Sequence, residues 1–256
     1  MGLFFLKLTL TPLLLALATL ATRRWGPTAG GRIVGLPLTS GPVSAFLALE
    51  QGRDFAADAA LGAILCAPAI IAYAMIYARL AKKAPWPVAV PIALCAFVAA
   101  ISALSLLKIP LAGATLLSAG LTTAALILEK PVASRPAAIT APWWDIPFRM
   151  LTATVVVITI TALSAHLGPR LSGIFSAFPV FICVMSAFSH KLSGPESIRG
   201  ISRGIAMATF SFITFFLAVA LTVQHMHLFF VYLLAVLAAG CVNMATVFVL
   251  GPQKTR

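Results

Sequence analysis

A pattern of glycine and proline residues occurs twice in the chain, 142 positions apart and without a gap. The first copy covers residues 26–62 and the second covers residues 168–204. Gly and Pro make up only roughly 7% and 5% of average sequences, so chance does not explain this agreement. These residues determine backbone conformation, and we infer that one backbone geometry has been duplicated. The nine identical pairs are Gly26/Gly168, Pro27/Pro169, Gly31/Gly173, Pro37/Pro179, Ser44/Ser186, Ala45/Ala187, Phe46/Phe188, Gly52/Gly194 and Gly62/Gly204.

Long apolar runs fill the rest of the chain. Hydrophobic residues make up 61% of the 256 positions and charged residues 9%. A soluble core of this size cannot hide so much apolar surface, so the sequence predicts an all-α integral membrane protein. Charge, Pro and Gly bound nine candidate transmembrane spans: 3–22, 31–49, 57–80, 86–107, 109–128, 148–166, 171–189, 201–223 and 227–250. The first run could be a signal peptide, but the Arg23-Arg24 pair after it acts as a stop signal, so we expect a retained helix.

The basic residues predict the orientation of the chain. The net charge is +12, but these residues lie in short loops and form no basic face or binding motif, so we expect no nucleic-acid partner. With the N-terminus outside, fourteen Lys and Arg residues fall on the cytoplasmic side and four fall outside. The excess predicts an outside N-terminus and a cytoplasmic C-terminus. The four tryptophans then lie at cytoplasmic helix ends, as in an interfacial belt: Trp25, Trp86, Trp143 and Trp144.

Spans one to four correspond to spans six to nine, and the fifth span has no counterpart. It shifts the second copy by an odd number of crossings, so we expect a 4+1+4 inverted-topology repeat. Secondary transporters are built in this way, with the substrate near the bilayer midplane where broken helices meet. The predicted organisation is a first four-helix repeat (1–108), a linking helix (109–128), a cytoplasmic linker (129–147) and an inverted second repeat (148–251).

The second span carries an unusual load of helix breakers. Pro37 and Pro42 lack amide donors, and each glycine costs about 1 kcal/mol relative to Ala. We therefore expect a broken or re-entrant segment, which membranes tolerate only where protein buries it or it lines a cavity. The same break in both copies predicts a central substrate site; the alternative is two kinked helices that bind nothing. The candidate substrate-binding residues are Gly31, Gly35, Pro37, Thr39, Ser40, Ser44, Gly173, Ser176, Pro179 and Ser186.

Charged residues near the spans provide further candidates. Lys7 and Arg149 occupy equivalent places near the start of spans one and six. As substrate ligands they would favour an anion such as a phosphate, a carboxylate or a lipid-linked phosphate; alternatively, both side chains snorkel to the interface. Glu50 and Asp58 are the best candidates for ion coupling by depth, and solvated loop charges are the alternative reading.

Other site chemistries lack a pattern in this sequence. The four cysteines lie inside apolar runs without metal spacing, and His225-x-His227 has no nearby Cys, Asp or Glu. We find no phosphate-binding glycine loop, nucleophile elbow or HExxH helix. We therefore expect no metal, no cofactor and no enzymatic activity.

The second copy contains the motifs Phe178-Pro179-Val180-Phe181 and Gly194-Pro195-Glu196-Ser197, followed by Gly204. With these residues it resembles the GlpM family of small four-helix bacterial inner-membrane proteins. Arg149 or Lys7 would match the family's basic residue in helix one, and Pro179 or Pro37 its proline in helix two. The first copy departs from the pattern at Leu38-Thr39 and Arg53-Asp54. The resemblance implies a bacterial inner-membrane location and a link to envelope polysaccharide production, but no substrate.

The leading hypothesis is a secondary transporter or flippase-like carrier that moves a small or lipid-linked anionic solute by rocking one repeat against the other. Membrane lipid surrounds it. The alternative is a non-transporting accessory or scaffold subunit of envelope polysaccharide biosynthesis. The partners we consider are a second copy of the chain, as a homodimer, and an envelope-biosynthesis protein.

Overall fold

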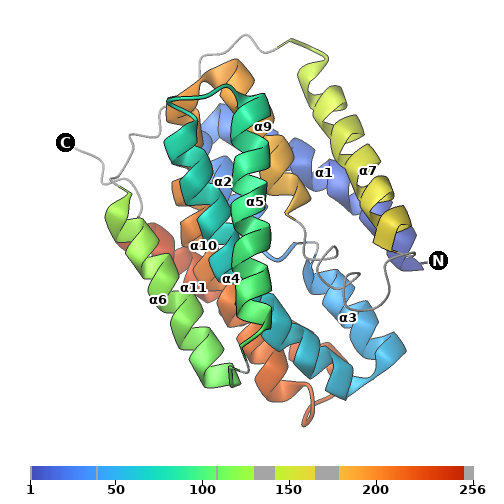
Figure 1. Ribbon diagram of the computed structural model, residues 1–256. Helices are drawn as coiled ribbons and strands as arrows, with labels where there is room; N and C mark the ends of the chain where they lie inside the picture. Colours follow the sequence, from blue (N-terminus) through green and yellow to red (C-terminus); the bar gives the residue numbers. More distant parts are fainter. Residues whose placement is uncertain (1, 39, 108, 130–141, 165–178, 251–256) are drawn as a thin grey trace.

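The computed structural model describes residues 2–38, 40–107, 109–129, 142–164 and 179–250, which form ten helices and no strand (Figure 1). The helices are α1 (Gly2–Trp25), α2 (Pro27–Gly35), α3 (Ser40–Gln51), α4 (Arg53–Leu80), α5 (Trp86–Ser105), α6 (Leu111–Leu128), α7 (Asp145–Ser164), α9 (Val180–Ser193), α10 (Pro195–Thr222) and α11 (Leu228–Leu250). The helices α4, α5, α6, α10 and α11 are long and apolar enough to cross a membrane, and α9 is a shorter apolar helix. The described chain is thus all-α and consistent with a membrane protein, as predicted.

The central helices α4 and α10 pack against each other and share several features. Each has 28 residues, and their first residues lie 142 positions apart. Each follows a glycine with a positive φ angle, 92° at Gly52 and 78° at Gly194, a conformation that residues with a Cβ rarely adopt. The starts of α5 and α11 and the ends of α3 and α9 show the same offset. The Gly52/Gly194 pair therefore marks the same turn at two places in the chain.

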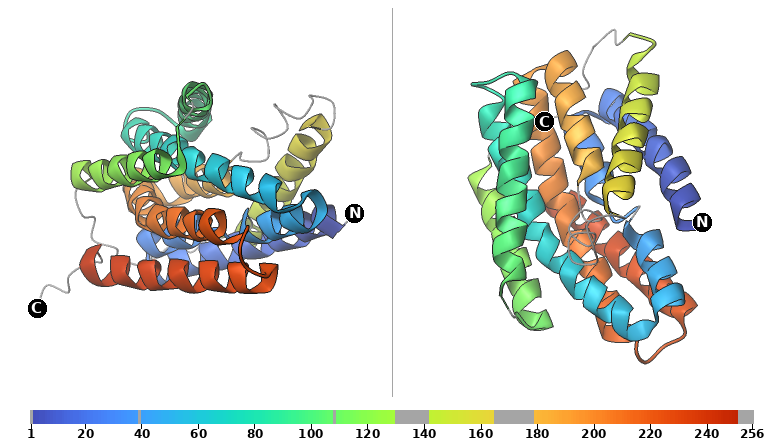
Figure 2. Two further views of the ribbon diagram at one scale, coloured as in Figure 1. Left: turned by 90° about the horizontal axis from the view of Figure 1, so that it is seen from below. Right: turned by 45° about the vertical axis from the view of Figure 1, so that its right-hand side comes forward.

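Helices at corresponding positions run in opposite directions. Lys82, just after α4, lies 2.9 Å from Glu196 in the first turn of α10. At the other end, Asp54 in the first turn of α4 accepts a 2.7 Å hydrogen bond from Gln224, just after α10. The helices α4 and α10 are therefore antiparallel. The helices α1 and α7 are antiparallel as well, and they lie together at one edge of the bundle, away from α6 (Figure 2).

The predicted break in the second span is confirmed. The helix α2 ends at Gly35 and α3 begins at Ser40, with an irregular segment around the buried Pro37 between them. The carbonyl of Pro37 accepts a 2.8 Å hydrogen bond from the Gly41 amide, so the turn into α3 keeps its backbone paired. In the second copy, α9 begins directly after Pro179, and residues 165–178 lie outside the described part.

The short helix α2 contacts α10 at the level of the backbone. A Cβ atom at Gly31 would overlap the carbonyl oxygen of Ile201, and one at Gly204 would overlap the carbonyl oxygen of Thr28. Each helix carries its glycines four residues apart, Gly31 with Gly35 and Gly200 with Gly204. This small-xxx-small spacing allows two helices to approach closely in a membrane.

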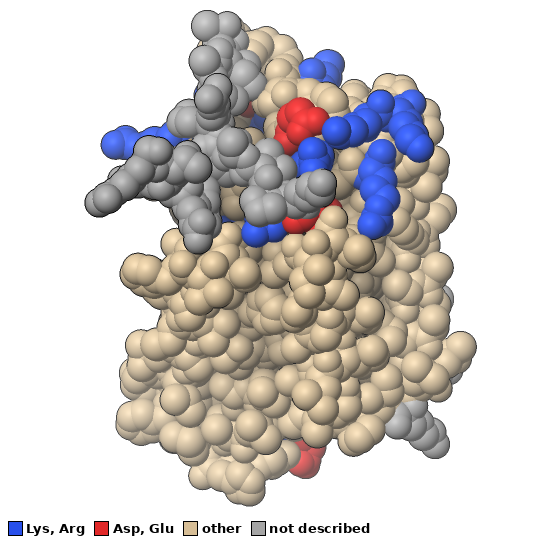
Figure 3. All heavy atoms as spheres, turned by 90° about the vertical axis from the view of Figure 1, so that its left-hand side faces the viewer, with Lys and Arg blue, Asp and Glu red and all other residues tan. Residues whose placement is uncertain are grey.

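Charged side chains gather at one end of the molecule. On the face in Figure 3, the visible Lys and Arg side chains and most of the acidic ones lie at this end, above a broad band without charge, and an acidic side chain lies at the opposite end. Large apolar side chains are exposed on the long helices: Leu116 of α6 is 73% and Phe248 of α11 is 83% exposed. Such a surface is suited to lipid, with the charged end at an interface.

We expect Gly204→Ala to destabilise the protein, because the added methyl group meets the backbone of α2. Overpacking of this kind costs about 1–3 kcal/mol. Gly62 is the matched control, since it occupies the equivalent position of the first copy but has open space around it. Gly62→Ala should be neutral or slightly stabilising, because Ala favours a helix by about 1 kcal/mol over Gly. Thermal unfolding in detergent measures both; equal effects would contradict the close approach of α2 and α10.

Candidate functional site

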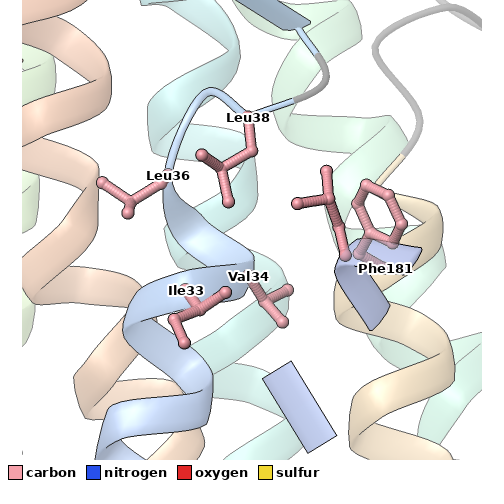
Figure 4. A pocket seen from close by; sticks show the side chains of 6 residues that line it. Ile33, Val34, Leu36, Leu38 and Phe181 are labelled. Carbon is pink, nitrogen blue, oxygen red and sulfur yellow. The ribbon is translucent and has the colours of Figure 1, made fainter. Parts of the chain in front are cut away.

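The break between α2 and α3 forms one wall of an apolar recess. Its lining comes from α1, α2, the break itself and α9: Leu14, Ile33, Val34, Leu36, Leu38 and Phe181. Figure 4 shows the leucines of the break and the end of α2 on one side and Phe181 on the other. Residues of both copies of the repeated sequence pattern, Leu36 and Leu38 of the first and Phe181 of the second, therefore line this recess. All six lining side chains are hydrocarbon, so the recess offers no polar side-chain group to a free anion.

The predicted substrate-binding residues lie in several different environments. Gly31 and Gly35 pack against α10, while Pro37 is buried at the break beside the recess. Ser40 begins α3 and is half-buried, and Pro179 is buried directly before α9. Thr39, Gly173 and Ser176 lie outside the described residues.

The two serines of the repeat face different helices. The hydroxyl of Ser44 shares a 3.0 Å hydrogen bond with the hydroxyl of Tyr232, which joins α3 to α11. Ser186 is buried in α9 beside Tyr73 of α4, whose buried hydroxyl has no hydrogen-bond partner in the described part of the chain. The structure thus places Ser44 and Ser186 beside different helices instead of in one shared site.

Arg149 is the centre of a buried ion cluster. Arg149 is 4% exposed and Asp145 is 1% exposed. The Nε atom of Arg149 donates a 2.8 Å hydrogen bond to the Asp145 carboxylate. Arg23 of α1 reaches the other oxygen of that carboxylate at 2.7 Å. The guanidinium of Arg149 also lies over the Phe188 ring at 5.0 Å and donates to the sulfur of Met185 at 3.5 Å. Arg149 is therefore buried among side chains of α1, α7 and α9.

The cluster carries one surplus positive charge. Arg23 and Arg149 are cations, and Asp145 is the one acidic group bonded to them among the described residues. Arg23 keeps a third of its side chain exposed, so the surplus charge is accessible from the charged end. Sequence reasoning found Arg149 but missed Arg23 and Asp145 as its partners. The i,i+4 spacing of Asp145 and Arg149 was a usable signal, whereas the contact with Arg23 is not visible in the sequence.

The structure describes the other predicted charged site residues only in part. The side chains of Lys7 and Glu50 lie outside the described part. Asp58 is exposed on α4, and its proposed role in coupling stays a prediction. Within the described residues, no group of three or more His, Cys, Asp or Glu side chains could hold a metal ion.

A second buried arginine, Arg203 of α10, binds the ends of two other helices. It donates to the Glu129 carbonyl of α6 at 2.9 Å and to the Leu250 carbonyl of α11 at 3.4 Å. Such carbonyls have no partner inside their own helix and attract a cation. Burial raises the pKa of the neighbouring Glu129 carboxyl, and a 2.9 Å hydrogen bond from Ser202 partly offsets this effect. We interpret Arg203 as a structural residue that holds the ends of α6 and α11 against α10.

Comparison with protein-family models, with curated proteins and with solved structures gives no match to this chain. The resemblance to the GlpM family therefore stays a prediction.

We expect Asp145→Asn to destabilise the protein strongly, because it leaves Arg149 buried without a carboxylate. Breaking one partner of a buried pair typically costs about 3–5 kcal/mol. The matched control is Glu196→Gln, which removes the surface ion pairs with Lys82 and Arg199 and should have little effect. Chemical or thermal unfolding in detergent measures both. A wild-type stability for Asp145→Asn would show that the buried cluster does not hold α1 and α7 together.

Proposed function

We propose that the chain is a membrane carrier built from two inverted repeats, a secondary transporter or flippase-like protein for a small or lipid-linked anionic solute. The observation that carries this proposal is the relation between α4 and α10. They match in length and in their starting glycine, begin 142 positions apart and run antiparallel against each other. The proposed repeats are residues 1–108 and 148–251, in nine crossings with α6 as the linking span.

The contacts between the proposed halves fit a rocking movement. The first half meets the second along α4 and α10, α2 and α10, and α1 and α7. The irregular segment at Pro37 lies beside these contacts and beside α9, so it lines the boundary along which two rocking bodies would part. A site at such a boundary is reached from opposite sides of the membrane in the two states.

The surplus charge of the ion cluster supports an anionic solute. Arg23 and Arg149 lie at the boundary of α1 and α7, within reach of the charged end. The positive-inside rule assigns this end to the cytoplasm, which gives an outside N-terminus and a cytoplasmic C-terminus. The resemblance to the GlpM family favours the bacterial inner membrane.

We expect lipid or anion movement across proteoliposomes that depends on the break. Two probes separate the solute classes: a fluorescent phosphatidylglycerol, followed by dithionite quenching, and radioactive inorganic phosphate, followed by uptake. Pro37→Ala should slow the transported probe severalfold, because a regular helix would close the irregular segment. Pro87→Ala, at an exposed position of α5, is the control and should leave the rate unchanged.

Absence of movement of either probe in the folded wild-type protein would count against a carrier of these anions. Co-purification of an envelope-biosynthesis protein in the same case would favour the accessory-subunit alternative.

We expect the two ends of the molecule to label from opposite sides of the membrane. In a variant without the four native cysteines, Gln51→Cys should react with an impermeant maleimide on intact cells. Lys83→Cys should react only after permeabilisation. Gln51 and Lys83 are exposed near opposite ends of α4. The reverse labelling would refute the assigned orientation but leave the inverted relation of the helices intact.

A further inference from the structure

The charge of Arg32 has no acidic partner in the described part of the chain. Arg32 is half-buried in α2, and its Nη2 atom donates a 2.6 Å hydrogen bond to the side-chain oxygen of Asn243 in α11. Among the described residues, no carboxylate forms an ion pair with it, and its buried Nε atom has no hydrogen-bond partner. Within that part, the guanidinium thus uses one neutral acceptor for a full positive charge and five donors.

Two other arginines are buried more deeply, but their partners account for them. Arg149 is paired with the Asp145 carboxylate, and Arg203 donates to the carbonyl groups at the ends of α6 and α11. Arg32 has only the amide of Asn243. A neutral amide does not compensate a buried positive charge as a carboxylate does. A purely structural role therefore explains Arg32 less well than it explains Arg149 and Arg203.

The contact between Arg32 and Asn243 lies within an apolar part of the molecule. Asn243 precedes the end of α11 at Leu250 by seven residues, or about 10 Å along a helix. The helix α11 is long and apolar enough to cross a membrane. A charged side chain at such a depth is costly, and in membrane proteins it typically marks the pathway of a substrate or an ion. An anion bound at Arg32 would offset this cost.

The two side chains are held by protein on one side and open on the other. A Cβ atom at Gly204 would lie 2.8 Å from the Arg32 amide nitrogen, so α10 fixes the backbone from which the guanidinium extends. Asn243 is half-buried, and Gly240, one turn earlier in α11, is exposed. A Cβ atom at Gly240 would meet nothing within 4 Å. A ligand can therefore approach the pair beside α11.

We infer that Arg32 and Asn243 bind a phosphate group, and we call this pair the Arg32–Asn243 site. The Asn243 side chain has two amide donors besides its oxygen, so a phosphate with three acceptor oxygens can bond to the guanidinium and the amide at once. The phosphate is either a free ion or part of a lipid. The inference rests on the proposed function in one respect: the bound group is part of the solute that the carrier moves.

The site joins the two proposed repeats beside the break. Arg32 belongs to the first repeat and Asn243 to the second, and α2 ends three residues after Arg32, at Gly35. A phosphate bound by both residues therefore lies at the boundary along which the repeats would part. Binding and movement are coupled in this arrangement, because the two ligands of the phosphate separate when the repeats do.

Asn243→Asp separates binding from a structural role of the pair. The new carboxylate supplies an anion inside the protein, so it pairs with Arg32, keeps α2 joined to α11 and repels a phosphate. A purely structural pair would become more stable in this variant without any effect on ligands. Arg24→Gln is the control for non-specific attraction, because Arg24 is exposed at the end of α1 and lies 5.9 Å from the Trp25 ring.

The experiment follows thermal unfolding of the purified protein in a nonionic detergent at constant ionic strength, since a ligand of the folded state raises the unfolding temperature. The probes are inorganic phosphate and dihexanoyl phosphatidylglycerol. We expect at least one probe to stabilise the wild-type protein. Arg32→Gln should raise the apparent Kd of that probe at least tenfold, the effect of losing one charge-assisted hydrogen bond. Asn243→Asp should unfold at or above the wild-type temperature without a probe and lose the response. Arg24→Gln should respond like the wild type.

Stabilisation by phosphate would identify a free anion as ligand, and stabilisation by the lipid alone a lipid-linked one. The inference is overturned if neither probe stabilises the wild-type protein, or if Arg32→Gln and Asn243→Asp respond as the wild type does. Probe flux in proteoliposomes separates the two proposals. Arg32-dependent binding without flux refutes the carrier and leaves the site, whereas flux that survives both substitutions refutes the site and leaves the carrier.

Discussion

The close approach of α2 to α10 is the contact on which the arrangement depends. In lipid, burying apolar side chains gains little, because the solvent is as apolar as the side chains, so helices associate through tight packing. A helix of nine residues such as α2 is also too short to be stable by itself. The contact of its glycines with the backbone of α10 supplies the missing stability and fixes where α2 lies. The irregular segment that follows Gly35 is thereby held at one place, beside α9.

The same boundary carries both the least polar and the most polar features of the interior. The recess at the break is lined by hydrocarbon, and the cluster of Arg23, Asp145 and Arg149 lies further along α1 and α9. Buried charges are costly unless they are paired, and the structure pairs two arginines with one carboxylate. The cluster therefore holds α1 and α7 together and keeps one charge uncompensated. The pairing of two arginines with one carboxylate thus accounts for both the structural role of the cluster and its proposed role in binding an anion.

Local backbone chemistry was the part that the sequence predicted well. The break near Pro37 follows from residues that act on their own backbone, and the structure has it; the paired Gly52 and Gly194, part of the duplicated backbone geometry, both have a positive φ angle. The contacts of other residues depend on distant partners. Gly31, a candidate substrate-binding residue, packs on Ile201, and the candidate Ser44 pairs with Tyr232. Such partners come from the packing of helices, which a single sequence does not specify, and the Arg23–Asp145 contact was missed for the same reason.

The helix α6, the linking span of the proposed carrier, has a consequence for any movement of its two proposed halves. Its Ser118 donates a 2.8 Å hydrogen bond to the Ile64 carbonyl of α4, and Arg203 of α10 binds the carbonyls at its end. The helix is therefore fastened to both halves along one side of the molecule, while α1 and α7 lie at the other side (Figure 1). In the proposed carrier, two bodies that are joined along one side open at the opposite side. The side that opens is the one with α1 and α7, where part of the Arg23 side chain is exposed.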